Sequence, residues 1–206
     1  VGAAAHESQS RFLESDVGRS HAFWQANCNQ LVNLFPEFKD VSVDELVSMI
    51  NKTECALIRT EADELTYPLH IMVRYEIEKE IAKGNIDYDK LPELWADKYE
   101  EYLGVRPANY KEGVLQDMHW STGYLGYFPT YALGSAYAAQ LYATMEKQFD
   151  VEEALLTNHF EKITNWLKEN VHHYAASKSM AEIVEEVSGE PFNPDYYTDY
   201  LIKKYK

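Results

Sequence analysis

The chain has 206 residues, 46% of them hydrophobic, which is enough for a substantial core and argues against disorder. Its formal net charge of −15 argues against binding nucleic acid or an anionic membrane, because both require basic patches. Its apolar runs are too short to span a bilayer, so no membrane partner is expected. Cys28 and Cys55 are too few for a disulfide framework, and we expect buried free thiols in a cytoplasmic, reducing setting.

The first third of the chain has helical patterns. Residues 3–34 have the composition of one long helix that ends before Pro36. Ser42 and Glu45 have the spacing of a capping box, which predicts a short helix that ends at Ile50.

The segment 55–83 is interrupted by Pro68, and a helix is expected after the proline and before Gly84. The residues just before the proline, 57–58, suit an extended conformation. A further helix is expected over residues 91–103, because Gly104 follows it.

Residues 116–130 are the least regular part of the sequence, since their glycines and Pro129 exclude one long helix. Helices are expected over residues 133–149 and 152–174. Ser179 and Glu182 form a second capping-box pattern, and the helix after it ends at Gly189. Asn193 and the proline after it begin the last helix. The predicted fold class is therefore all-α or nearly all-α.

Residues 113–120 carry the densest chemistry, with the sequence Gly-Val-Leu-Gln-Asp-Met-His-Trp. An amide, a carboxylate, an imidazole and an indole lie within a few positions, and a glycine- and tyrosine-rich loop follows. Each of these polar groups needs a partner if it is buried, so such a stretch is typical of a pocket that holds a substrate.

Three motifs together resemble the M32 metallocarboxypeptidases, the thermostable carboxypeptidase 1 type. They are His-Glu-Ser-Gln at 6–9, the segment 59–78, and Gln-Asp-x-His-Trp at 116–120 followed by Gly-Tyr-Phe-Pro-Thr-Tyr at 126–131. They fall in the family's order, and the resemblance covers essentially the whole chain. It implies a helical zincin-like peptidase domain, of which residues 1–206 are expected to be a single C-terminal segment. The family's His-Glu-x-x-His zinc helix is expected upstream of His6.

Glu7 is the metal ligand that the resemblance implies, as the third zinc ligand beside two upstream histidines. From the residues alone, Glu7 reads as a solvated acid at a helix start or as a partner of Arg11. His6 diverges from Glu7 by about 100° on a helix, so a capping or second-shell role is expected for it. Gln9 is expected to be a second-shell hydrogen-bonding group.

Arg59 is the expected binder of the substrate's terminal carboxylate, because a guanidinium is a planar bidentate partner for that group. The alternative is an ion pair with one of the acids that follow it, at 61, 63 or 64. Arg74 is a rival, although its helical neighbours Tyr75 and Glu78 suggest a structural pair. His70 lies within the same family segment.

His119 and Tyr131 are the catalytic candidates, as donors to the developing oxyanion. The alternative for His119 is a buried histidine that is satisfied by Asp117. Tyr127 is the rival of Tyr131 and otherwise a substrate-binding residue. Gln116 is also expected to bind substrate, and Asp117 to support the site from the second shell.

The resemblance implies a zinc-dependent carboxypeptidase that releases C-terminal amino acids from peptides. It further implies that an upstream glutamate activates water, that cobalt can replace zinc, and that the complete protein is a homodimer. The site is incomplete in this chain, so the chain alone is expected to be inactive and to bind zinc weakly. The rival interpretations are a non-catalytic helical interaction module and a self-contained hydrolase that uses His119 with Asp117.

Overall fold

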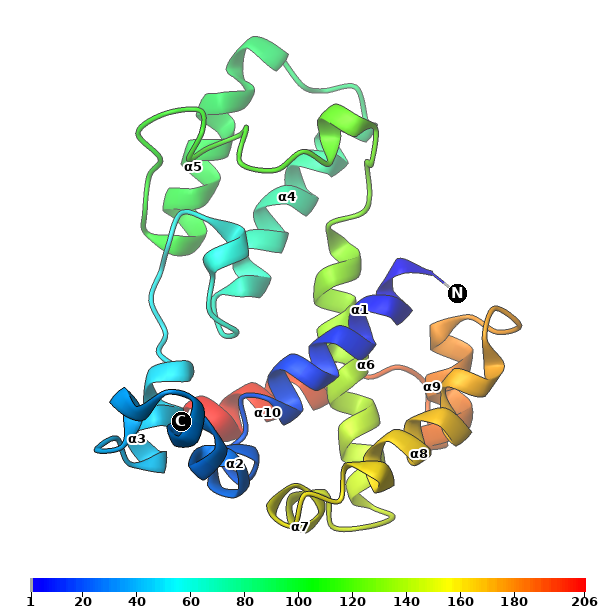
Figure 1. Ribbon diagram of the computed structural model, residues 1–206. Helices are drawn as coiled ribbons and strands as arrows, with labels where there is room; N and C mark the ends of the chain where they lie inside the picture. Colours follow the sequence, from blue (N-terminus) through cyan, green and yellow to red (C-terminus); the bar gives the residue numbers. More distant parts are fainter. Residues whose placement is uncertain (1) are drawn as a thin grey trace. The chain divides into compact units, whose positions relative to one another are not determined.

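The computed structural model describes residues 2–206, and these residues contain helices and no β-strand (Figure 1). The expected all-α class is therefore confirmed. The α-helices of this part of the chain are α1 (Ala3–Arg11), α2 (His21–Leu34), α3 (Val43–Ile50), α4 (Tyr67–Ala82), α5 (Leu91–Leu103), α6 (Pro129–Glu146), α7 (Val151–Leu156), α8 (Phe160–Asn170), α9 (Met180–Ser188) and α10 (Asp195–Tyr205). None of these helices combines the length and apolar character needed to cross a membrane.

The two capping boxes predicted from sequence begin α3 and α9. The Ser42 hydroxyl accepts the Glu45 amide at 3.2 Å, and the Glu45 carboxylate accepts the Ser42 amide at 2.9 Å. The same reciprocal bonds join Ser179 and Glu182. Each box satisfies amide groups that the first turn leaves without partners in the helix.

The prediction of one helix over residues 3–34 is wrong. Helix α1 ends at Arg11, a π-helical turn follows over Phe12–Val17, and α2 begins at His21. The break has a local cause, because the Ser20 hydroxyl accepts the Phe23 amide at 3.2 Å and so caps a new helix.

The prediction of one helix over residues 152–174 is also wrong. Helix α7 ends at Leu156 and α8 begins at Phe160. Between them, Asn158 has a φ of 57°, a left-handed conformation that asparagine tolerates better than most residues and that ends a helix. The helix expected over 133–149 begins earlier, at Pro129, since proline is favoured in the first turn of a helix.

The chain divides into two compact units. Unit 1 comprises the residues up to Lys52 together with Leu133–Lys206, and unit 2 comprises Thr53–Ala132. The core of unit 1 draws on α1, α6, α7, α8 and α9, with Phe12, Leu141, Met145, Leu155 and Ile163 fully buried. That residues 1–206 form one segment of a larger domain stays a prediction.

In unit 2, α4 packs against α5 (Figure 1). Its core has two clusters of buried side chains, one with Val73, Ile77, Trp95, Tyr99 and Leu103, the other with Tyr67, Ile71 and Phe128. Both cysteines of the chain are free, but Cys28 is only half-buried and Cys55, in unit 2, is exposed. The expectation of buried thiols is therefore wrong.

Candidate active site

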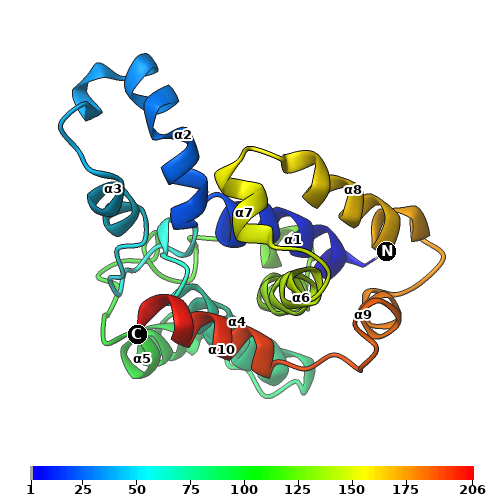
Figure 2. The same ribbon diagram turned by 90° about the horizontal axis from the view of Figure 1, so that it is seen from below.

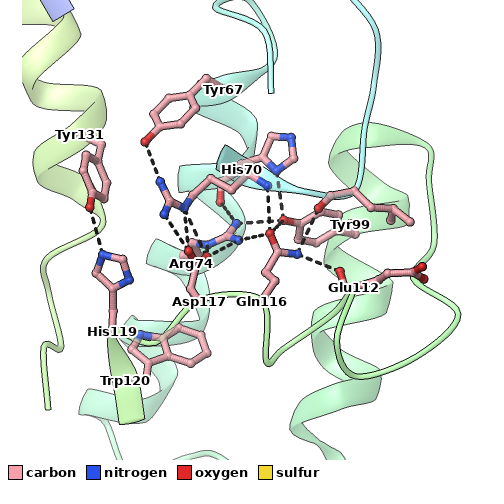
Figure 3. A network of polar contacts seen from close by, with 12 residues as sticks. Tyr67, His70, Arg74, Tyr99, Glu112, Gln116, Asp117, His119, Trp120 and Tyr131 are labelled. Carbon is pink, nitrogen blue, oxygen red and sulfur yellow. Dashed lines mark hydrogen bonds and ion pairs between the residues drawn. The ribbon is translucent and has the colours of Figure 1, made fainter. Parts of the chain in front are cut away.

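One face of α4 carries a stripe of buried polar side chains. His70, Arg74 and Glu78 recur every four residues, so they lie one above another on the same face of the helix. All three are buried: His70 and Arg74 have no exposed surface, and Glu78 retains 6%. Figure 3 shows His70 and Arg74 beside the segment that carries Gln116 and Asp117. The stripe is therefore the base on which the irregular segment 112–131 is held.

Asp117 lies between two arginines. Its Oδ1 accepts from Arg59 Nη2 at 2.7 Å, and its Oδ2 accepts from Arg74 Nε at 2.8 Å. Burial acts to raise the pKa of Asp117, but the hydrogen bond from Arg59 and the charges of both arginines outweigh it, and the pKa is lowered. The site thus holds a buried carboxylate with two buried guanidinium groups.

Gln116 is saturated by contacts to the protein. Its side-chain oxygen accepts from the Arg59 amide and from Arg74 Nη2, both at 2.9 Å (Figure 3). Its amide nitrogen donates to the carbonyls of Leu57 at 3.0 Å and Glu112 at 2.8 Å. These bonds occupy both N–H groups of the amide. A role of Gln116 in binding substrate stays a prediction, and these contacts do not favour it.

His119 and Tyr131 form a hydrogen-bonded pair beside a hollow in the surface of unit 2. His119 Nε2 lies 3.0 Å from the Tyr131 hydroxyl (Figure 3), and the Tyr127 ring lies 5.3 Å from that of Tyr131. These three residues line a hollow of about 420 Å³ with Met118, Thr122 and Tyr124. A small polar pair in a largely aromatic hollow is the arrangement expected of a substrate site.

The imidazole of His119 is held neutral around pH 7. Burial lowers its pKa, and although the charge of Asp117 opposes this, the charges of Arg59 and Arg74 add to it. Nδ1 of His119 is buried and has no hydrogen-bond partner within residues 2–206. Only the Nε2 side of the ring is therefore engaged, with Tyr131.

Glu78 ties the loop after His119 to α4. One of its carboxylate oxygens accepts from the Trp120 indole at 2.8 Å and from the Gly126 amide at 3.0 Å. The other oxygen is buried without a partner among the residues that the structure describes. The loop between Trp120 and Gly126, next to the hollow, is thus fixed at both ends by a single side chain.

The remaining predicted residues lie in unit 1, on α1. Glu7 is half-buried, and Ser10 Oγ lies 3.4 Å from its Oε2. Gln9 is half-buried, with its side-chain oxygen 2.8 Å from His172 Nε2, and His6 is exposed. Arg11, the predicted alternative partner of Glu7, pairs with Glu14 at 3.0 Å.

The side chains on α1 include one that suits a metal site. Carboxylate oxygens are good ligands of divalent metals, so Glu7 fits one ligand position. Within residues 2–206, however, no group of three His, Cys, Asp or Glu side chains is placed to hold a metal ion. A ligand role of Glu7 therefore stays a prediction, and the described residues do not hold a complete ligand set. A larger hollow in unit 1, of about 670 Å³ around Arg19 and Lys204, contains none of the predicted site residues.

The structure brings together six of the predicted residues within unit 2: Arg59, Gln116, Asp117, His119, Tyr127 and Tyr131. Arg59 does form an ion pair, but with Asp117, 58 positions away, and not with the acids next to it in sequence. Arg74 likewise pairs with Asp117, and His119 bonds Tyr131 where Asp117 was the alternative partner.

Sequence reasoning missed Tyr67, Tyr99 and the role of Glu78. The Tyr67 and Tyr99 hydroxyls accept from Arg59 Nη1 at 2.9 Å and Arg74 Nη1 at 3.0 Å. The available signal is the four-residue spacing of His, Arg and Glu on α4 among apolar residues. Because the apolar residues between them are expected to face the core, these polar residues are expected to be buried too and not to form a solvated helix face.

The profile of the Carboxypeptidase Taq (M32) metallopeptidase family matches residues 1–205. The chain belongs to the M32 metallopeptidase family. Carboxypeptidase 1 of Bacillus subtilis is 46% identical to it over 202 residues, and Thermostable carboxypeptidase 1 of Thermus thermophilus is 41% identical over 206. These matches cover 97% and 100% of the chain but 40% of each relative, so the chain spans about two fifths of their length.

Solved structures agree with this M32 assignment. An M32 carboxypeptidase from Deinococcus radiodurans matches 100% of the chain with a TM-score of 0.96 at 38% identity. The Pyrococcus furiosus carboxypeptidase matches 100% with a TM-score of 0.97 at 36% identity. The chain covers 42% of each of those structures.

Proposed function

We propose that this M32 chain is the C-terminal part of a zinc-dependent carboxypeptidase that releases single amino acids from the C-termini of peptides. The observation that carries the proposal is the His119–Tyr131 pair at 3.0 Å, which lines an aromatic hollow beside the buried arginines. The identity of 46% to a carboxypeptidase supports the reaction class.

Glu7 is proposed as one zinc ligand, with the remaining ligands and the water-activating base lying outside residues 2–206. Zinc, when bound, would polarise the scissile carbonyl as a Lewis acid and lower the pKa of water. The family resemblance is the basis for proposing zinc, and also for proposing that cobalt can replace it. His6 and Gln9 are proposed to support Glu7 from the second shell.

His119 and Tyr131 are proposed to stabilise the oxyanion that forms when the peptide bond is attacked. Both groups are neutral hydrogen-bond donors when the imidazole carries its proton on Nε2, and they already point toward one another (Figure 3). Their mutual bond must open so that both can reach one substrate oxygen. The lowered pKa of His119 supports this role, because it favours the neutral form of the ring.

Arg59 is proposed to bind the terminal carboxylate of the peptide. Asp117 and Tyr67 engage its Nε, Nη1 and Nη2, and only 8% of its side chain is exposed, so the substrate must use the second N–H of Nη1 or Nη2 or displace one of these partners. Asp117 then acts as a second-shell group that orients the guanidinium, and Arg74 as its structural partner. Tyr127 is proposed as part of the wall of the side-chain pocket.

The complete protein is proposed to be a cytoplasmic homodimer, as the family resemblance implies. The competing interpretation is a non-catalytic interaction module, and the activity of the complete protein separates the two.

The test uses the complete protein with His119→Ala and Tyr131→Phe. Loss of one oxyanion donor lowers kcat by about 10²–10³-fold and changes KM little, because the interaction develops in the transition state. Tyr110→Phe, an exposed tyrosine of the same unit, is the matched control. The zinc content of each variant is measured so that metal loss is not mistaken for loss of a donor. Full kcat in both variants would contradict the proposed roles, and absence of activity in the unmodified protein would favour the interaction module.

A further inference from the structure

Gly134 lies on α6 where the backbone of α6 meets α1, and it is buried. A Cβ atom added at Gly134 would lie 2.6 Å from the Cβ of Glu7, 2.9 Å from the carbonyl carbon of Glu7 and 3.0 Å from the Ser8 nitrogen. Figures 1 and 2 show α1 lying across α6 in unit 1. Glycine is therefore required here by the space between two helices and not by backbone conformation.

Other small residues are buried on both helices. Ala5 and Ser8 are buried on α1. The Ser8 hydroxyl donates to the Ala5 carbonyl at 2.7 Å, so its hydrogen bond stays within α1. On α6, Ala138 is buried in the same core cluster as Ala5. Small residues let the two backbones approach closely, and Gly134 marks the point where even a methyl group does not fit.

This contact fixes Glu7 through its main chain. Two of the three atoms nearest to Gly134 are backbone atoms of Glu7 and Ser8, and the third is the Cβ from which the Glu7 carboxylate extends. Ordinary contact begins at 3.4 Å, so a methyl group at 134 requires the two Cβ atoms to separate by about 0.8 Å more than the structure allows. A metal ligand tolerates much less, because productive site geometry is held within roughly 0.5 Å.

We propose that Gly134 is a positioning residue for Glu7, which sets where the carboxylate stands by letting α6 lie directly against α1. This inference rests on the proposed function of Glu7 as a metal ligand. It predicts that metal affinity depends on a residue that has no side chain and no ligating atom.

The first test measures the zinc affinity of the complete protein by competition with a chelator. Gly134→Ala is expected to weaken zinc binding about 10–100-fold, the effect typical of losing support for a ligand. Gly2→Ala is the matched control, because a Cβ there meets no atom within 4 Å and the φ of −76° suits alanine. Unfolding of the metal-free proteins is followed in parallel. A folded Gly134→Ala protein with unchanged zinc affinity would overturn the proposal.

The second test does not depend on whether Gly134→Ala folds. If α6 holds the Glu7 Cβ in place, Glu7→Asp cannot move its shorter side chain toward the metal and loses nearly as much zinc affinity as Glu7→Ala. Near-normal affinity of Glu7→Asp would show that α1 shifts freely against α6, and would overturn the positioning role. Unchanged zinc affinity of Glu7→Ala would instead show that Glu7 is not a ligand. That result would contradict the proposed function itself and is distinct from failure of the positioning role.

Discussion

Asp117 is the residue on which the charge balance of unit 2 depends. Its carboxylate is 7% exposed and binds Arg59 and Arg74, whose side chains are 8% and 0% exposed. Two buried guanidinium groups around one carboxylate are tolerable only because Gln116, Tyr67 and the carbonyl of His70 accept their remaining hydrogen bonds. Removing the carboxylate leaves both cations buried without a counter-charge.

Asp117→Asn is therefore expected to lower the free energy of unfolding of this chain by about 3–5 kcal/mol, the cost of breaking a buried ion pair by removing one partner. Urea unfolding at pH 7 measures it. Asp40→Asn is the control, because Asp40 is exposed and lies 3.9 Å from Lys39. If both substitutions lower the free energy of unfolding by less than about 1 kcal/mol, the Asp117 carboxylate is not needed to neutralise the two buried arginines.

At this scale the sequence indicated candidate residues, but not which of them contact one another. Asp117, His119 and Tyr131 were singled out by motif. The partner of Arg59 was not found, because Asp117 lies 58 positions away and local spacing instead offers the acids directly after Arg59. Long-range pairing of buried charges is set by tertiary packing, which a single sequence does not display.

Helix α4 is the element that organises the candidate site. Its polar stripe binds Asp117 and Gln116 through Arg74, and holds Trp120 and Gly126 through Glu78. The loop between those last two residues follows His119 directly. The helix thus serves as a rigid support for a segment that has little regular structure of its own.

Glu78→Ala is expected to free the Trp120–Gly126 loop, since it removes the one acceptor that both ends share. Amide hydrogen exchange at Gly126 should accelerate about fivefold or more, in line with the loss of roughly 1 kcal/mol of hydrogen bonding. Glu78→Gln keeps an acceptor oxygen and should restore most of the protection.

Equal exchange at Gly126 in Glu78→Ala and the unmodified chain would show that the loop is held by other contacts. Glu80→Ala, at a half-buried position two residues further along α4, controls for general effects on the helix.

Helix ends were predictable where a side chain specifies them. The capping boxes at Ser42 and Ser179, and the left-handed glycines 104 and 189, all stand where the sequence indicated. The breaks near Ser20 and Asn158 were missed because neither contains proline, although polar residues lie at both. There the capping bond of Ser20 and the left-handed φ of Asn158 decide the structure.

The stability of the whole chain should depend on pH through His70. Its ring is fully buried, with Nδ1 3.0 Å from the Tyr99 hydroxyl, and burial together with the charges of Arg74 and Arg59 lowers its pKa to about 4. In the unfolded chain a histidine has a pKa of about 6.5. Between these two values the unfolded state binds more protons, so the free energy of unfolding falls as the pH drops.

Acidification from pH 7 to pH 5 should therefore cost the unmodified chain about 2 kcal/mol more than it costs His70→Gln, as measured by urea unfolding. His173→Gln, an exposed histidine, should lose as much as the unmodified chain. The same pH dependence in His70→Gln and the unmodified chain would mean that His70 is not buried in its neutral form.

The whole chain corresponds to about two fifths of the M32 carboxypeptidases that it matches. The proposed metal ligand within this chain is the single carboxylate of Glu7. Because one carboxylate gives little zinc affinity, we expect the chain alone to bind zinc weakly and to be inactive. The proposed function therefore requires further ligands from outside residues 2–206.

The most direct test is zinc-dependent release of the C-terminal amino acid from an N-blocked dipeptide. The purified chain alone should release none. Adding a segment that carries the His-Glu-x-x-His helix should restore release, and Glu7→Ala should abolish that restoration. Release by the chain alone, or equal restoration with Glu7→Ala, would contradict this proposal.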